Sequence, residues 1–289
     1  MTAPAPNPDS GVARVVCEQL APRVGDLAHN KELAVDAVRR ALSERADIVV
    51  LPELVTSGYV FADTDEARRT AITPDDAFFT DLTRLLSGTR TVVVLGFCED
   101  GGSTLYNSAA VLDADGVRAV YRKTHLWDRE TLFFTPGERM APVVTTAHGR
   151  IGVLICYDLE FPEMPRRLAT AGADLIAVPT NWPLEERPVG ERPAEIVQAQ
   201  AAARANGVYI ACADRGGTER GQAWTQGTAV INQYGWITAT ATATATAATR
   251  HRAVTDVFLH LSRDKSLSPH NDLLRDRRTD LYAQESPQL

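Results

Sequence analysis

Short apolar runs recur along the chain, and polar stretches and turn residues separate them. Runs of this length, rich in Val, Ile and Leu, are typical of strands buried on both faces. Between them, residues 30–46 repeat apolar side chains at helical spacing, with Leu33, Ala37 or Val38, and Ala41 or Leu42 on one face. We therefore predict a layered α/β fold. The strands are expected at residues 11–20, 46–53, 91–97, 151–156, 174–180 and 208–213.

Other parts of the chain complete this pattern. Residues 105–112 and 117–123 are joined by DADG, a turn sequence that predicts a hairpin. Residues 162–172 and 193–207 are expected to be helices, with a proline early in the first and a glycine ending the second. Hairpins beside a β/α series favour mixed sheets over purely parallel ones.

The chain shows no composition break that would divide it. We predict one domain over residues 1–289, with its core at about residues 12–260 and a polar tail at 261–289 that packs on a neighbour or a partner chain. Residues 238–249 consist of Thr and Ala that alternate up to Ala247, which favours an exposed hairpin strand over a linker.

Composition excludes several classes of protein. The net charge is −7 and the basic residues form no stripe, so nucleic acid is not an expected partner. No apolar run approaches the ~20 residues that span a bilayer, and the N-terminus lacks a signal-peptide pattern, so we expect a cytoplasmic protein. The cysteines are too scattered for a zinc site or a disulfide framework. They are Cys17, Cys98, Cys156 and Cys212.

Three residues with chemical potential each stand at the predicted end of a strand. Glu53 ends 46–53, Lys123 ends 117–123, and Cys156 ends 151–156, after which the chain turns polar at once. Taken singly, each has an ordinary interpretation: a solvent-facing acid, a solvated lysine and a core thiol. Strand ends are where α/β proteins bind ligands, so together they suggest a base, a cation and a nucleophile at one site.

The segments around these residues resemble the nitrilase superfamily of carbon–nitrogen hydrolases. The matching segments are LPELVTSGY around Glu53, YRKTHLWDRE around Lys123, GVLICYDLEFPE around Cys156, and ADLIAVPTNW after it. This resemblance implies a four-layer α-β-β-α sandwich with mixed sheets, a homodimer or higher homo-oligomer with the tail at the interface, and no cofactor or metal.

The resemblance also implies roles for individual residues. Cys156 would attack an amide or nitrile carbon, and Glu53 would take the thiol proton and pass it to the leaving nitrogen. Lys123 and the amide N–H of Tyr157 would stabilise the tetrahedral intermediate, and Glu130 would help to position the substrate. Water activated by Glu53 would then hydrolyse the thioester.

The residues after the nucleophile bear on the substrate. Nitrilases proper usually have Trp-Glu there, whereas Tyr157 and Asp158 follow here, as in the amidase and carbamoylase branches. Glu160 occupies a segment where branches acting on carboxylate substrates often carry arginine, which favours a small linear amide with a distal amino or guanidino group, such as 5-aminopentanamide. The alternative is that Glu160 pairs with an arginine of the next helix. Further pocket candidates are Tyr59, Asn181 and Trp182.

Other functions remain open at this point. The same triad would cleave N-carbamoyl amines or amino acids, and less readily nitriles. A Cys–His hydrolase or amidotransferase would instead use a histidine as base, although the glycine-flanked elbow of such enzymes is absent around Cys156. A binding protein without activity is the alternative outside enzymes. The histidines are His29, His125, His148, His251, His260 and His270.

Overall fold

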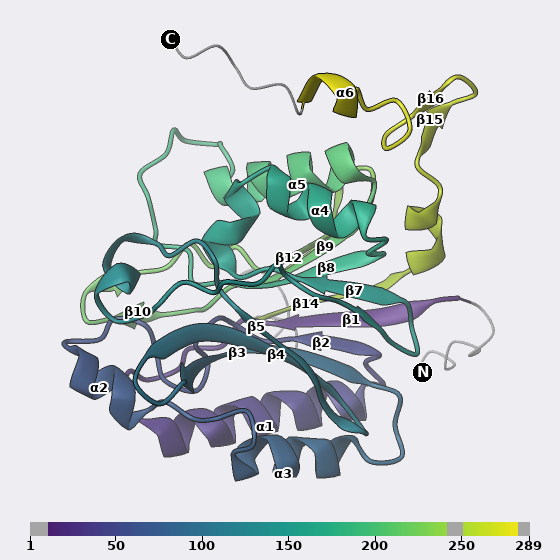
Figure 1. Cartoon of the computed structure of the whole chain (residues 1–289). Coiled ribbons are helices and arrows are strands. Elements are labelled where there is room, and N and C mark those ends of the chain that lie inside the picture. Colours follow the sequence, from purple (N-terminus) through teal and green to yellow (C-terminus); the bar gives the residue numbers. More distant parts are fainter. Residues whose placement is uncertain (1–10, 242–250, 283–289) are drawn as a thin grey trace.

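Two six-stranded sheets pack face to face in the computed structural model, which describes residues 11–241 and 251–282. Helices cover the outer face of each sheet, which gives four layers in the order α-β-β-α (Figure 1). This confirms the predicted α/β sandwich. No helix within the two described ranges has the length and apolar character needed to cross a membrane.

The first sheet has the strand order β14-β1-β2-β3-β4-β5. Its centre is parallel, β1 with β2 and β2 with β3, whereas β14, β4 and β5 add antiparallel pairs. The predicted hairpin is β4 and β5. The strands are β1 (Ala13–Glu18), β2 (Ile48–Val50), β3 (Val92–Asp100), β4 (Leu105–Asp113), β5 (Gly116–Arg122) and β14 (Arg252–Val257).

The second sheet repeats this plan in the order β13-β12-β9-β8-β7-β6. Strands β7, β8 and β9 are parallel, and antiparallel strands flank them. Both sheets are therefore mixed, as predicted. The strands are β6 (Val143–Thr145), β7 (Arg150–Val153), β8 (Leu175–Pro179), β9 (Tyr209–Ala213), β12 (Ala229–Ile231) and β13 (Ile237–Thr240).

The helices cover the sheets through small or apolar faces. Helix α1 buries Ala34, Ala37, Val38 and Ala41, and the side chain of Asp26 caps its first turn. Figure 1 shows α1 and α3 below the first sheet and α4 and α5 above the second. The helices are α1 (Leu27–Ser43), α2 (Thr64–Arg69), α3 (Ala77–Leu86), α4 (Glu163–Thr170), α5 (Ala194–Asn206) and α6 (Thr279–Tyr282).

Short elements connect the layers. Two-stranded ribbons are formed by β10 (Thr218–Glu219) with β11 (Gln222–Ala223) and by β15 (Ser266–Ser268) with β16 (Asn271–Asp272). Single 3₁₀ turns are η2 (Asp128–Leu132), η3 (Cys156–Glu160) and η4 (Leu259–Arg263). Two of these turns, η2 and η3, begin near the residues that the sequence singled out.

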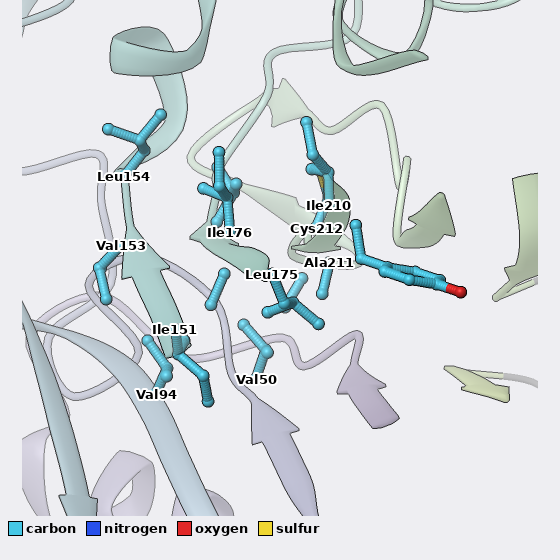
Figure 2. Close-up of a cluster of buried hydrophobic side chains, with 14 of the residues drawn as sticks. Val50, Val94, Ile151, Val153, Leu154, Leu175, Ile176, Ile210, Ala211 and Cys212 are labelled. Atoms are coloured by element: carbon cyan, nitrogen blue, oxygen red, sulfur yellow. The ribbon is translucent and has the colours of Figure 1, made fainter. Parts of the chain in front are cut away.

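The main core lies between the sheets. Val50 and Val94 of the first sheet pack with Ile151, Val153 and Leu175 of the second in one buried cluster (Figure 2). A second cluster fills the space between the first sheet and the helices α1 and α3. The polar ends of strands from both sheets therefore meet at the edge of a continuous apolar layer.

Several boundaries differ from the sequence predictions. The second predicted strand ends at Val50 instead of Glu53, and β7 ends at Val153, so Cys156 belongs to the turn η3. Helix α1 begins at Leu27, before the predicted residue 30. Helix α3 was not predicted. The Thr-Ala segment begins as strand β13, but residues 242–250 lie outside the described residues.

The C-terminal segment contacts the second sheet and its helices. Lys265 Nζ donates to the carbonyl oxygens of Asn206 and Gly207 at the end of α5, at 3.1 and 2.8 Å. Arg263 pairs with the buried Asp174 at 3.0 Å. These contacts lie within the described residues 261–282, and the place of the tail at a dimer interface stays a prediction.

Candidate active site

Glu53 is completely buried just after strand β2. The chain can turn there because Gly96 of β3 has no side chain: a Cβ at residue 96 would lie 2.5 Å from Glu53 Cα. The next residue, Leu54, has φ +49°, a left-handed conformation that L-residues adopt at a cost. Close packing of β3 thus fixes where the Glu53 carboxylate points.

Lys123 follows strand β5 and is also completely buried. Its main-chain N–H donates to the carbonyl oxygen of Asn107 at 2.8 Å, which continues the pairing of β4 with β5. Its ammonium nitrogen lies 2.7 Å from Oε1 of Glu53 and 2.7 Å from Oε1 of Glu130. The lysine therefore joins two carboxylates and keeps a third N–H for another acceptor.

The two carboxylate oxygens of Glu53 differ in their surroundings. Oε1 accepts hydrogen bonds from Lys123 and from the side-chain amide of Asn107, both at 2.7 Å. Oε2 is buried and has no hydrogen-bond partner in the described part of the chain. An unpartnered buried carboxylate oxygen is costly unless another group uses it, and it is well suited to accept a proton.

Glu130 lies in the turn η2, and burial raises its pKa to about 7. The charge of Glu53 raises this pKa further, whereas Lys123 opposes both effects. The hydroxyl of Tyr59 donates to Oε1 of Glu130 at 2.7 Å, and the main-chain N–H of Trp127 donates to Oε2 at 3.2 Å. Tyr59 therefore contacts the second glutamate and does not line the cavity at Cys156.

Cys156 begins the turn η3 with φ +46°, and the residue is only 4% exposed. Burial raises the pKa of its thiol well above the ordinary value, and the charge of Glu53 raises it further. Lys123 and a hydrogen bond from the main chain of Asn181 lower it. The thiol is thus protonated at neutral pH and needs a nearby base to become a nucleophile.

Asn181 and Trp182 follow strand β8 in the second sheet. The side-chain amide of Asn181 donates to the main-chain oxygen of Glu53 at 2.9 Å, across the sheet interface. The carboxylate of Asp214 holds this segment by accepting from the Trp182 N–H and the Thr180 hydroxyl, both at 3.0 Å. Burial raises the pKa of Asp214 to about 6.

A cavity of about 160 Å³ opens at Cys156. Trp127, Tyr157 and Trp182 form part of its wall, and three carboxylates, Glu160, Glu185 and Glu195, also line it. No lysine or arginine is among its lining residues within the described ranges. The cavity is therefore small, aromatic and negatively charged.

The carboxylates of this cavity repel one another. Burial, followed by the charges of Glu195 and Glu185, raises the pKa of Glu160. Burial and the charge of Glu185 likewise raise the pKa of Glu195. No ion pair joins Glu160 to an arginine in the described structure, and Arg166 instead donates to the carbonyl oxygens of Leu273 and Ala205. The predicted alternative of a pair with the next helix is thus not formed.

The histidines do not take the place of a base for Cys156. His125 contacts Asp158, with Nδ1 2.8 Å from Oδ1, and it stacks on Phe161 with 3.8 Å between ring centroids. No histidine of the described residues forms a hydrogen bond with Cys156. The same ranges contain no group of three or more His, Cys, Asp and Glu side chains that could hold a metal ion.

Comparisons with known proteins identify the family of the chain. Residues 14–253 match the carbon–nitrogen hydrolases. The chain belongs to the carbon–nitrogen hydrolase family. As a member of that family it is a hydrolase acting on C–N bonds, and the predicted resemblance is confirmed.

Relatives in this family act in several ways. The chain is 33% identical over 274 residues to the nitrilase of Pyrococcus abyssi, which covers 94% of this chain and 99% of that one. It is 30% identical over 272 residues to the N-carbamoylputrescine amidase of Solanum lycopersicum, at 89% coverage of each. A double mutant of the amidase from Nesterenkonia sp. AN1, solved in complex with acrylamide, is 27% identical with a TM-score of 0.78, covering 97% of this hydrolase and 98% of that chain.

Some residues of this candidate site were not anticipated from the sequence of the hydrolase. Asn107 binds Glu53 but stands inside an apolar hairpin strand, where its polarity was the one available signal. Glu185 and Glu195 line the cavity at Cys156, yet they lie in a stretch with many charges. Asp158 also has contacts that its position after Cys156 did not reveal.

Proposed function

We propose that this protein is an amidase that hydrolyses a small linear primary amide to a carboxylate and ammonia through a Cys156 thioester. The observation that supports this most directly is the pairing of Lys123 with Oε1 of Glu53, while Oε2 has no hydrogen-bond partner among the residues that the structure describes. A carboxylate held in this way can accept a proton without losing the lysine. Cys156, whose thiol needs such a base, lines the cavity beside it.

The reaction proceeds in two halves. Glu53 accepts the thiol proton as the sulfur of Cys156 attacks the amide carbon, and the carbonyl oxygen becomes an oxyanion. The third N–H of Lys123 and the main-chain N–H of Tyr157 stabilise that charge. Glu53 then passes its proton to the nitrogen, the C–N bond breaks, and ammonia leaves. Water, deprotonated by Glu53, attacks the thioester and releases the carboxylate and the thiol.

The cavity supports a substrate with a positive charge at the end distant from the amide. Glu160, Glu185 and Glu195 place three carboxylates around a partly desolvated space that no lysine or arginine of the described residues lines. Lys123 and Arg187 lower the pKa of Glu160 and of Glu195, respectively, from outside the cavity, and burial outweighs both effects. An ammonium or guanidinium group would relieve their mutual repulsion and form charge-assisted hydrogen bonds. We therefore propose an ω-amino or ω-guanidino amide, with Trp182 and Tyr157 packing against its aliphatic chain.

Hydrolysis of N-carbamoyl amines is the second candidate. The N-carbamoylputrescine amidase of Solanum lycopersicum is among the relatives, and a ureido carbon can be attacked by the same thiol. Nitrile hydrolysis is a third, weaker candidate, because Tyr157 and Asp158 follow the nucleophile. The Pyrococcus abyssi relative is nevertheless a nitrilase. A panel of all three substrate types therefore decides between them.

The test measures ammonia release from pentanamide, 5-aminopentanamide, N-carbamoylputrescine and valeronitrile, with the Cys156→Ala variant as blank. We expect 5-aminopentanamide to be cleaved with a kcat/KM about tenfold or more above that of pentanamide, since a charged hydrogen bond contributes ~1.5–3 kcal/mol. Glu195→Gln and Glu160→Gln should each reduce this preference. Glu163→Gln is the matched control, because Glu163 is an exposed residue at the start of α4 and does not line the cavity at Cys156.

Two results would contradict the proposal. Cleavage of the carbamoyl compound alone would assign the carbamoylase reaction. A Glu53→Gln variant with full turnover, together with its loss in a histidine variant, would assign a Cys–His mechanism. A stable thioester trapped on Cys156 by mass spectrometry would exclude a binding protein without activity.

The family resemblance also supports a homodimer located in the cytoplasm, with residues 261–289 at the subunit contact. Sedimentation velocity of the full chain and of a chain that ends at residue 260 tests this arrangement. We expect a dimer that dissociates when the tail is removed.

A further inference from the structure

Asp158 is a buried carboxylate two residues after Cys156, and five donors surround it. It is 0% exposed. Oδ1 accepts from the main-chain N–H of His125 at 3.0 Å, the hydroxyl of Thr124 at 3.0 Å, and lies 2.8 Å from Nδ1 of His125. Oδ2 accepts from the hydroxyl of Tyr121 at 2.8 Å and from the main-chain N–H of Ile155 at 3.2 Å.

These donors come from the two segments that carry the reacting groups. Tyr121, Thr124 and His125 flank Lys123, and we call residues 121–125 the lysine segment. Ile155 precedes Cys156 in the turn where φ of Cys156 is +46°. Each oxygen of Asp158 thus binds one main-chain N–H, one in the lysine segment and one in the cysteine turn. A single side chain joins the first sheet to the second beside the catalytic groups.

We propose that Asp158 is a positioning residue that sets where Lys123 stands relative to Cys156. The inference rests on the proposed function, in which the lysine stabilises an oxyanion formed at the cysteine. It acts through the backbone, because Asp158 binds the residues on either side of Lys123 and the residue before Cys156. A displacement of about 1 Å between such groups is enough to reduce turnover ~100-fold.

Replacement of Asp158 by asparagine would remove one of its two main-chain hydrogen bonds. Its amide has one acceptor oxygen and one NH₂ group, so it can replace only one carboxylate oxygen. The hydroxyls of Tyr121 and Thr124 can rotate to become acceptors, but a main-chain N–H cannot. Whichever way the amide is turned, its NH₂ faces the N–H of either Ile155 or His125. Asp158→Asn must therefore release one of the two segments while preserving size and shape.

Asp174 offers a matched control, because it binds the start of β7, the strand that leads into the turn with Cys156. Asp174 is 2% exposed and accepts from the main-chain N–H of Arg150 at 2.9 Å, where β7 begins. It also pairs with Arg263. Asp174→Asn therefore disturbs a buried carboxylate with a main-chain partner on β7, but far from the lysine segment. It should lower the unfolding temperature without lowering kcat.

The first experiment compares the steady-state kinetics of Asp158→Asn and Asp174→Asn, using the best amide substrate of the parent protein. We expect Asp158→Asn to lose about 100-fold in kcat with KM changed by less than about threefold, because the interaction lost is one made in the transition state. A kcat within about threefold of the parent would overturn the proposal, as would an equal loss in Asp174→Asn.

The second experiment measures the rate at which iodoacetamide alkylates Cys156 as a function of pH, which needs no substrate. Lys123 lowers the pKa of this thiol, so its displacement moves the profile of Asp158→Asn to higher pH. Removal of the Asp158 charge alone would move the profile to lower pH. Glu53 and Glu130 also face the thiol and are unchanged in both variants. An unmoved profile or a shift to lower pH contradicts the proposal.

A milder double variant covers the case in which Asp158→Asn does not fold. Tyr121→Phe with Thr124→Val removes two donors of the lysine segment and leaves both main-chain hydrogen bonds to Asp158 in place. We expect about a tenfold loss of kcat and the same direction of shift in the alkylation profile. Parent kinetics and an unmoved profile in this variant would overturn the proposal. If the parent hydrolyses no amide, the proposed function fails, and alkylation still tests Asp158.

Discussion

Lys123 stands between two carboxylates in a region without solvent. With both glutamates ionised, the group of Glu53, Lys123 and Glu130 would carry one excess negative charge, which burial opposes. The pKa of Glu130, raised to about 7, is the physical result: near neutral pH this residue holds a proton about half of the time. The protonation of Glu130 therefore changes the charge that Glu53 experiences.

We predict that this titration appears in the rate of hydrolysis. Ionised Glu130 raises the basicity of Glu53, so kcat should rise as pH increases through about 7. Glu130→Gln removes the titrating group and should abolish that rise, with kcat staying near the low-pH value of the parent at every pH. The measurement is the pH–rate profile from pH ~5 to ~9. Glu138→Gln, at an exposed position on the following segment, serves as control. A rise near pH 7 that persists in Glu130→Gln would refute this assignment.

Strand β3 packs closely against the residues that follow β2, and this contact determines the position of Glu53. A Cβ at Gly96 would lie 2.5 Å from Glu53 Cα and 2.6 Å from the nitrogen of Leu54, and both are backbone atoms that cannot rotate away. The side chain of Glu53 therefore depends on a residue that has no side chain. The position of Glu53 is therefore a property of how β2 and β3 pack together.

Gly96→Ala should accordingly disturb both stability and activity. We expect a loss of about 1–3 kcal/mol in the free energy of unfolding, the usual cost of overpacking, and a fall in kcat because Glu53 moves relative to Lys123. Gly216→Ala is the comparison, since its added Cβ would meet atoms no closer than 3.7 Å. Urea unfolding and steady-state kinetics give the two quantities. Equal behaviour of both variants would show that β3 does not fix Glu53.

The periodicity of the sequence predicted most elements, but not their ends. The run at residues 46–53 is mostly apolar, yet β2 ends at Val50. Leu51 still donates to Val94, but Pro52 has no N–H and only accepts from Gly96. Helix α3 escaped prediction although Phe78, Phe79, Leu82 and Leu86 follow helical spacing, since adjacent aromatics favour strands.

The candidate site divides in the same way. Glu53, Lys123 and Cys156 were singled out because each interrupts an apolar pattern. The structure pairs Lys123 with Glu53, and the charges of both act on the thiol of Cys156, while the catalytic roles of the three stay a prediction. Asp158 and Asn107 were not, because their roles come from donors elsewhere in the chain that no local pattern records. The cavity carboxylate Glu195 enters only when helix α5 packs beside η3.

For the whole molecule, buried acids make folding depend on pH. Burial raises the pKa of Asp214 from its ordinary 3.8 to about 6, although several donors oppose this. The folded state therefore binds a proton more readily than the unfolded state. The contribution of Asp214 to the free energy of unfolding is fully present below pH 3.8 and is lost as pH rises through about 6.

We predict the size of this effect from the shift. Raising pH from ~4 to ~7 should reduce the free energy of unfolding of the parent by about 2 kcal/mol more than that of Asp214→Asn. The variant is less stable at low pH, so the comparison concerns the slope with pH and not the absolute value. Urea unfolding at a series of pH values measures it. Asp256→Asn, at an exposed ion pair, should keep the parent slope.

In the proposed mechanism, each sheet supplies only part of the catalytic group. Glu53 and Lys123 follow strands of the first sheet. Cys156 follows a strand of the second sheet, as does Asn181, whose side-chain amide donates to the main-chain oxygen of Glu53. The rate of hydrolysis should therefore depend on how closely the two sheets pack against each other. A substitution that loosens the contact between the two sheets should abolish turnover while the circular dichroism spectrum still shows intact secondary structure.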